Sequence, residues 1–174
     1  MTLAHLTGGG GLLDGLAHPV LGVDHLIAIV VVGTLAFLLR DRLAWMTLPA
    51  TFVGAMAVGG ILGVLGITSG SSELFVALSV VLLGVVLLAL TGVIDGRALA
   101  GLVALVALFH GLAHGGEVPS TASPAVYVIG FLLATAGLHL AGVALGPVLA
   151  RSRLVRGIAG AGVATAGLVL ASGV

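Results

Sequence analysis

The chain has 174 residues, of which 60% are hydrophobic and 7% are charged, and its formal net charge at pH 7 is zero. Such a composition cannot supply a water-soluble surface, so it indicates an integral membrane protein with the lipid bilayer as its surroundings. Cysteine is absent, which excludes disulfides, thiolate metal sites and cysteine nucleophiles. Lysine is also absent, and nothing in the charge pattern indicates a nucleic-acid partner.

The chain begins with a glycine-rich stretch, Gly8–Ala17, that is too short to span a bilayer. We expect it to form at most a half-helix packed in the outer mouth of the protein. The next segment, 19–39, is long enough to span, provided that Asp24 and His25 are tolerated inside it, and Pro19 suits the first position of a helix. Five further apolar segments follow: 45–67, 73–94, 98–116, 125–149 and 155–173. The sequence therefore predicts a single all-α polytopic membrane domain over residues 1–174, with about six transmembrane helices.

The arginines predict the orientation of these helices. All six fall in the connections after the first, third and fifth spans: Arg40, Arg42, Arg97, Arg151, Arg153 and Arg156. Because positively charged connections stay on the cytoplasmic side, we expect both termini to lie outside.

Two short clusters combine histidine with carboxylate, and both fall inside or beside predicted spans: His18, Asp24 and His25, then His110, His114 and Glu117. At 1.5 Å per residue, His25 and His110 each lie roughly 9 Å from the outer end of their helices. The spacing of the second cluster places its three members on one helix face. Ionisable groups are costly in hydrocarbon and mark ion or proton pathways, and imidazole with carboxylate is a ligand set for divalent transition metals.

His139 lies deeper, about 20 Å along the fifth span. A hydrogen bond between helices and a place on the inward metal route are equally good interpretations of this residue. Pairs of small residues such as Gly59 and Gly63, or Gly142 and Gly146, favour close helix packing. Gly111 and Gly115 each follow a candidate ligand, so they either pack helices or loosen the backbone around an ion.

Three helices in each half of the chain permit an inverted repeat. Both histidine clusters are predicted near the same membrane face, however, so they are not symmetry mates. The two halves show no convincing similarity in sequence.

Three motifs in this order resemble the HupE/UreJ family of nickel and cobalt permeases: His18-Pro19-x-x-Gly22-x-Asp24-His25-Leu26, Phe109-His110-Gly111-x-Ala113-His114-Gly115-x-Glu117, and Tyr127-x-x-Gly130-Phe131-x-x-Ala134-Thr135-x-x-Leu138-His139-x-x-Gly142. The resemblance implies a secondary metal transporter of the bacterial cytoplasmic membrane, associated with the supply of nickel to hydrogenase or urease, or with cobalt. It also implies that the first motif selects the metal and that the second is its partner. Where many members have Met one turn after the Asp-His pair, this chain has Ile29, which removes a soft ligand.

The residues themselves favour metal transport without settling the metal. Histidine and carboxylate also bind Zn²⁺ and Cu²⁺, so selection of Ni²⁺ or Co²⁺ requires geometry. An intramembrane zinc protease would need Glu directly after the first His of the helical pair, where this chain has Gly111. We expect no enzyme activity, no catalytic cofactor and no nucleotide-binding loop. A metal sensor or a proton channel uses similar residues and stays open as an alternative.

Overall fold

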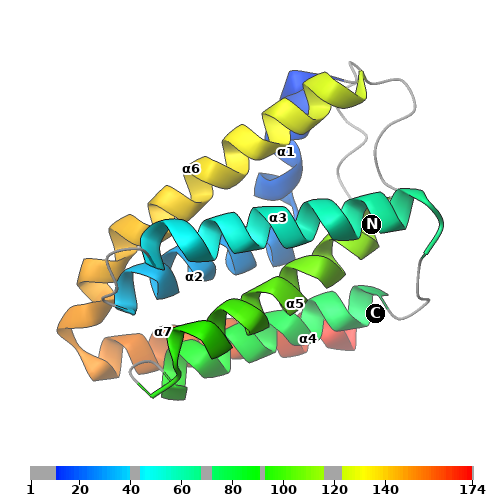
Figure 1. Cartoon of the computed structure of the whole chain (residues 1–174). Coiled ribbons are helices and arrows are strands. Elements are labelled where there is room, and N and C mark those ends of the chain that lie inside the picture. The colour runs from blue at the N-terminus through cyan, green and yellow to red at the C-terminus, as the bar shows by residue number, and fades with distance from the viewer. Residues whose placement is uncertain (1–10, 40–43, 68–71, 91–92, 116–122, 174) are drawn as a thin grey trace.

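The computed structural model describes residues 11–39, 44–67, 72–90, 93–115 and 123–173. Within these ranges the protein is entirely helical, and Figure 1 shows its elements: α1 (Leu12–Leu21), α2 (Val23–Leu38), α3 (Ala44–Val64), α4 (Ser72–Val85), the π-helix η2 (Val86–Leu90), α5 (Gly96–His114), α6 (Pro124–Arg151) and α7 (Arg153–Ser172). Five helices are long and apolar enough to cross a membrane, and there are six spans if α1 and α2 form one broken span. The protein is therefore an all-α polytopic membrane protein, as its composition predicts.

The first span is broken, which the sequence did not predict. Pro19 does not begin a helix but lies buried inside α1, and the chain bends by 80° between α1 and α2 at Gly22. Tertiary packing explains the difference, because Gly15 lies directly against the backbone of Tyr127 in α6. This contact holds a glycine-rich segment as a helix that extends beyond the expected half-helix to Leu21. The break then allows residues before and after Gly22 to approach one point from two directions.

The long helices pack in close pairs through glycine. The main pairs are α2 with α6, α3 with α5, and α4 with α7, while α1 lies on α6. At Gly63 of α3, a β-carbon would lie 2.8 Å from the carbonyl oxygen of Leu112 in α5. Gly142 of α6 meets the backbone of α2 in the same way. Gly111 and Gly115 also face the backbone of α3, and α5 stays helical through both ligand positions to His114. Their role is therefore close packing.

This packing predicts a difference between two glycines of α3. A β-carbon at Gly59 would meet the carbonyl oxygen of Leu108, whereas a β-carbon at Gly54 has nothing within 4 Å. Gly59→Ala should lower the free energy of unfolding by about 1–3 kcal/mol, the usual cost of overpacking. Gly54→Ala, the matched control, should leave it unchanged or raise it, because alanine favours helix. Thermal unfolding in detergent measures both, and equal stability of the two variants would contradict the close α3–α5 contact.

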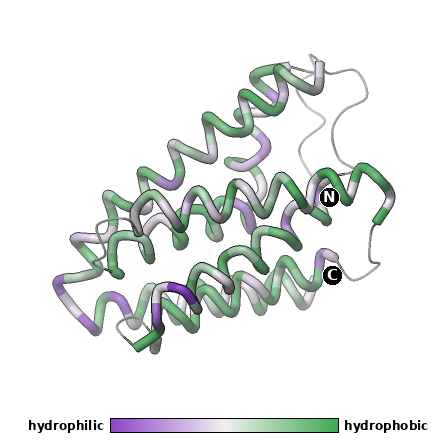
Figure 2. Tube along the Cα trace, viewed as in Figure 1, coloured by the Kyte–Doolittle hydropathy of each residue, from purple (hydrophilic) through white to green (hydrophobic). Residues whose placement is uncertain are grey.

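The bundle has two distinct ends (Figure 1). The helix ends that flank the connections from α2 to α3, from η2 to α5 and from α6 to α7 lie together, and they form what we call the arginine end. It carries the four arginines among the described residues: Arg97, Arg151, Arg153 and Arg156. Figure 2 shows hydrophilic segments gathered at these connections. Arg40 and Arg42 lie outside the described residues. The opposite end, where α2 begins and α5 finishes, is the histidine end.

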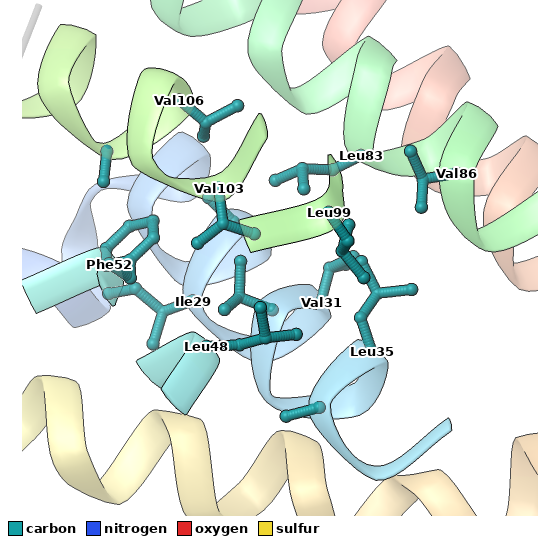
Figure 3. Close-up of a cluster of buried hydrophobic side chains, with 14 of the residues drawn as sticks. Ile29, Val31, Leu35, Leu48, Phe52, Leu83, Val86, Leu99, Val103 and Val106 are labelled. Carbon is teal, nitrogen blue, oxygen red and sulfur yellow. The ribbon is translucent and has the colours of Figure 1, made fainter. Parts of the chain in front are cut away.

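An apolar core fills the bundle between these ends. It joins α2, α3, α4 with η2, and α5, and Figure 3 shows Ile29, Leu48 and Phe52 among its members. Phe52 and Ile29 have no exposed surface. Ile29 lies one helical turn after His25, so the core begins directly beneath the histidines. A polar site at the histidine end is thereby separated from the arginine end by packed hydrocarbon.

Candidate metal site

Three histidines from three helices converge where the first span breaks. His18 stands in the last turn of α1, His25 in the first turn of α2, and His114 in the last turn of α5. One ligand atom from each of these residues lies within 4.8 Å of the other two. The rings of His25 and His114 have their centroids 4.3 Å apart, and the His18 ring lies 5.5 Å from His25 and 5.4 Å from His114. Because α1 and α2 meet at 80°, His18 and His25 face each other although they lie on different helices.

Asp24 places a carboxylate beside two of these rings. Its Oδ1 accepts a hydrogen bond of 2.7 Å from the backbone N–H of His25, at the start of α2, and lies 3.4 Å from Nδ1 of the same residue. Its Oδ2 lies 3.9 Å from Nε2 of His114. A carboxylate in this position orients imidazole rings and balances the charge of a bound cation. Asp24 can therefore act as a ligand or as the partner of His25.

His110 completes the floor of the cluster. Its ring centroid is 5.0 Å from that of His25, and the side chain has no exposed surface. Since a carbonyl oxygen only accepts, the 2.9 Å contact between Nδ1 and the carbonyl of Val106 places the ring proton on Nδ1. Nε2 therefore presents a lone pair, and among the described residues it has no hydrogen-bond partner. A buried nitrogen of this kind is costly unless something binds it, and a cation is one such partner.

The histidines line the floor of an otherwise apolar cavity of about 610 Å³. Its walls come from two helices that flank the cluster, and they include Met56, Gly60 and Ile61 of α3 and Tyr127 and Phe131 of α6. The cavity reaches the histidines between α3 and α6. The Tyr127 hydroxyl and the Met56 thioether are the polar or soft groups of these walls, so the imidazoles, with Asp24 beside them, are the main groups that can replace water around a cation.

Two aromatic residues of the site had no assigned role in the sequence. The Tyr127 ring lies 6.1 Å from that of His18, and the Phe131 ring lies 5.7 Å from it. Their spacing of four residues puts them on one face of α6, which was the available signal. That this face meets α1 follows only from the packing of the helices.

The structure brings five of the seven predicted residues together: His18, Asp24, His25, His110 and His114. His139 is buried but lies apart, with Nδ1 donating to the carbonyl oxygen of Thr135 at 3.0 Å. The Phe52 ring lies between two imidazoles, 6.1 Å from His110 and 5.5 Å from His139. Glu117 lies outside the described residues.

The fold and this cluster together define a polytopic helical membrane protein that carries a set of metal-ligating side chains inside its bundle. The profile of the HupE / UreJ protein family matches residues 1–170. Protein HupE of Rhizobium leguminosarum bv. viciae is 41% identical over 165 residues, which cover 94% of this chain and 85% of that protein. The chain belongs to the HupE/UreJ family. No solved structure matches it.

Proposed function

We propose that this protein takes up a divalent transition-metal ion, Ni²⁺ or Co²⁺, across the bacterial cytoplasmic membrane. The observation that carries the proposal is the convergence of His18, His25 and His114 on one point within 4.8 Å, at the floor of a cavity. Imidazole nitrogen is a preferred ligand of these ions, and Asp24 and His110 add a carboxylate and a further imidazole. Family membership supports the same reading, since the HupE/UreJ resemblance implies nickel or cobalt transport.

The geometry of the cluster suits capture by a small movement. In zinc sites an imidazole nitrogen lies about 2.0–2.1 Å from the ion, so two such ligands are at most about 4.2 Å apart. The three ligand atoms here lie within 4.8 Å, which exceeds that limit by less than an ångström. A slight approach of α1, α2 and α5 therefore closes the cluster on an ion. Metal capture is thereby coupled to the relative positions of α1, α2 and α5, which carry the three histidines.

The route inward passes the apolar core. The Phe52 ring packs near both His110 and His139, so an ion that passes from one imidazole to the other meets a packed aromatic ring. A packed ring on the route fits a carrier that opens first to one side and then to the other better than it fits a continuously open pore. In this proposal Glu117 joins the outer cluster and His139 serves the passage inward.

Metal accumulation separates transport from the rival functions. Purified protein in sealed vesicles should accumulate radioactive nickel or cobalt in the lumen, whereas a sensor or an intramembrane metalloenzyme would bind the ion without moving it. A His25→Ala variant in matched vesicles is the control, because it loses a candidate ligand, and its circular dichroism spectrum checks that it is folded. Binding without accumulation by the unaltered chain would contradict the proposal.

Orientation can be tested with single cysteines, since the natural chain has none. If the arginine end is cytoplasmic, a Ser123→Cys variant should react with an impermeant thiol reagent added to intact cells. Ser152→Cys, between α6 and α7 at the arginine end, should react only after the cells are opened. The reverse pattern would place the histidine cavity on the cytoplasmic side and turn uptake into export.

A further inference from the structure

The helix pairing repeats between the two halves of the chain. The first half contains α2, α3 and α4 with η2, and the second contains α5, α6 and α7. Exchanging α2 with α5, α3 with α6, and α4 with α7 converts the α2–α6 pair into the α5–α3 pair and leaves the α4–α7 pair in place. These three are the largest contacts of the bundle apart from that of α1 with α6, and the smaller contact of α2 with α3 has no match between α5 and α6 in the described part of the chain. Only α1 has no counterpart among the described elements.

The two units are inverted relative to each other. His25 in the first turn of α2 lies beside His110 and His114 in the last turns of α5. The two helices therefore run in opposite directions through the bundle. Units related in this way share an axis in the membrane plane, as in many secondary transporters.

The burial pattern supports the exchange residue by residue. When Gly33 is placed on Gly111, every buried position of α5 from residue 103 to 111 falls on a buried position of α2. Both glycines lie at a crossing with the partner helix, Gly33 against His139 of α6 and Gly111 against Met56 of α3. The alignment of α2 with α5 therefore matches residues that have the same burial and the same contacts with the partner helix, and not merely residues of the same type.

The same holds for α3 and α6. Placing Gly59 on Gly142 puts the buried positions 52, 56, 59 and 63 of α3 on the buried positions 135, 139, 142 and 146 of α6. The contacts correspond as well, because Gly142 meets Val30 and Gly59 meets Leu108, and the first alignment places Val30 on Leu108.

The α4–α7 pair has the symmetry expected of helices that exchange with each other. A β-carbon at Gly84 would lie 2.8 Å from Cα of Ala164, and this contact stands at the centre of the pair. On one side Gly167 meets Val81, and on the other Gly160 meets Leu88. When α4 and α7 are exchanged so that Gly84 falls on Ala164, the Gly167–Val81 contact falls within one residue of the Gly160–Leu88 contact.

We propose that the chain is an inverted repeat and that the outer cavity has a symmetry-related counterpart, an inner mouth that opens between α3 and α6 at the arginine end. This inference rests on the proposed function, because it supplies the exit for the metal. The α3 wall of the outer cavity includes Met56, Ala57 and Gly60. The exchange carries these positions to His139, Leu140 and Val143 of α6.

An independent observation lies at His139 and Leu140 and at Thr135, one helical turn before His139. Oγ1 of Thr135 and Nε2 of His139 are buried, and neither has a hydrogen-bond partner among the described residues. Leu140 beside them is 60% exposed. Polar atoms without partners are costly in a packed bundle, and water or a passing ion in the inner mouth would satisfy both.

The ligands themselves do not follow the symmetry. The positions that correspond to His25, His110 and His114 are Val103, Val32 and Ala36. The inner mouth therefore offers the single imidazole of His139 where the outer site offers several ligands. Fewer ligands hold the ion less tightly, so an ion that reaches the inner mouth is released.

Single-cysteine labelling in lipid nanodiscs tests the inner mouth, since a water-soluble maleimide reaches both ends there. Leu140→Cys is the test variant, because Leu140 corresponds to Ala57 in the wall of the outer cavity, and Ile61→Cys reports on the outer cavity itself. Leu133→Cys is the matched control, because Leu133 is 58% exposed and corresponds to Ala50, which does not line the cavity. We expect Leu140→Cys to label about tenfold faster than Leu133→Cys, because thiolate forms in water and not in hydrocarbon. Nickel should change the rates of Ile61→Cys and Leu140→Cys in opposite directions.

Equal, slow labelling of Leu140→Cys and Leu133→Cys with and without nickel, while Ile61→Cys reacts, would overturn the inner mouth. Nickel uptake by the same variants keeps the two proposals distinct. Uptake with no labelling at Leu140→Cys would leave the transport function standing and refute the exit. Opposite rate changes without any uptake would support the inner mouth and refute transport.

Discussion

A variant that lacks both His25 and His110 should bind nickel only slightly more weakly than either single variant. Each single alanine substitution should weaken binding by at least about 100-fold, because loss of groups that merely orient ligands already costs 10–100-fold. The two rings lie 5.0 Å apart on different helices. If both hold one ion, removal of the first largely abolishes the site, and the second then has little left to lose. Calorimetric titration of the three purified variants with nickel measures the coupling.

The comparison has a control inside the same bundle. Thr135 and His139 lie on α6 away from the cluster, so His139→Ala alone should leave nickel affinity close to that of the unaltered chain. Losses for His25 and His110 that add strictly would mean two separate sites. Such a result would contradict a shared cluster even if both residues proved necessary for uptake.

The general fold follows from the sequence because hydrocarbon imposes simple rules. Apolar length predicts the spans, and the arginines mark alternate connections. The helix ends that flank these connections lie together at one end of the structure. The break at Gly22 did not follow, since a proline before an apolar run favours the start of a helix. Contacts of Gly15 with Tyr127 and of Gly130 with Leu12 hold α1 instead. No local pattern reveals such a contact between segments so far apart in the chain.

The candidate site could be predicted in part. The rise per residue placed His25 and His110 at one depth, and the structure brings their rings together. His18 was assigned to the first cluster because it lies close to Asp24 and His25 in the sequence, although its own position, before Pro19, gives no depth within a span. The cavity walls and the position of Phe52 depend on which helices are neighbours. The sequence does not contain that information in a local pattern.

The symmetry of the bundle was hidden for a related reason. The halves share few residue types, and the histidines that attract attention are the positions that do not repeat. What repeats is the position of small residues such as Gly33 and Gly111 at helix crossings. Glycine is abundant throughout this chain, with 29 residues, so its spacing alone could not show which copies correspond.

Replacement of His139 by alanine should reduce nickel uptake while leaving capture at the outer cluster intact. His139 is 3% exposed, and its Nε2 has no hydrogen-bond partner among the described residues. The substitution therefore removes a buried nitrogen that could coordinate the ion, and it breaks no hydrogen bond of that nitrogen. We expect uptake to fall by about tenfold or more, which corresponds to a barrier higher by about 1.4 kcal/mol. Ser79→Ala is the matched control, because Ser79 is also buried but bonds only within its own helix, to Val76. Uptake and nickel titration on both variants separate passage from capture. Unchanged uptake would remove His139 from the route, and a collapse of nickel affinity would place it in the outer cluster.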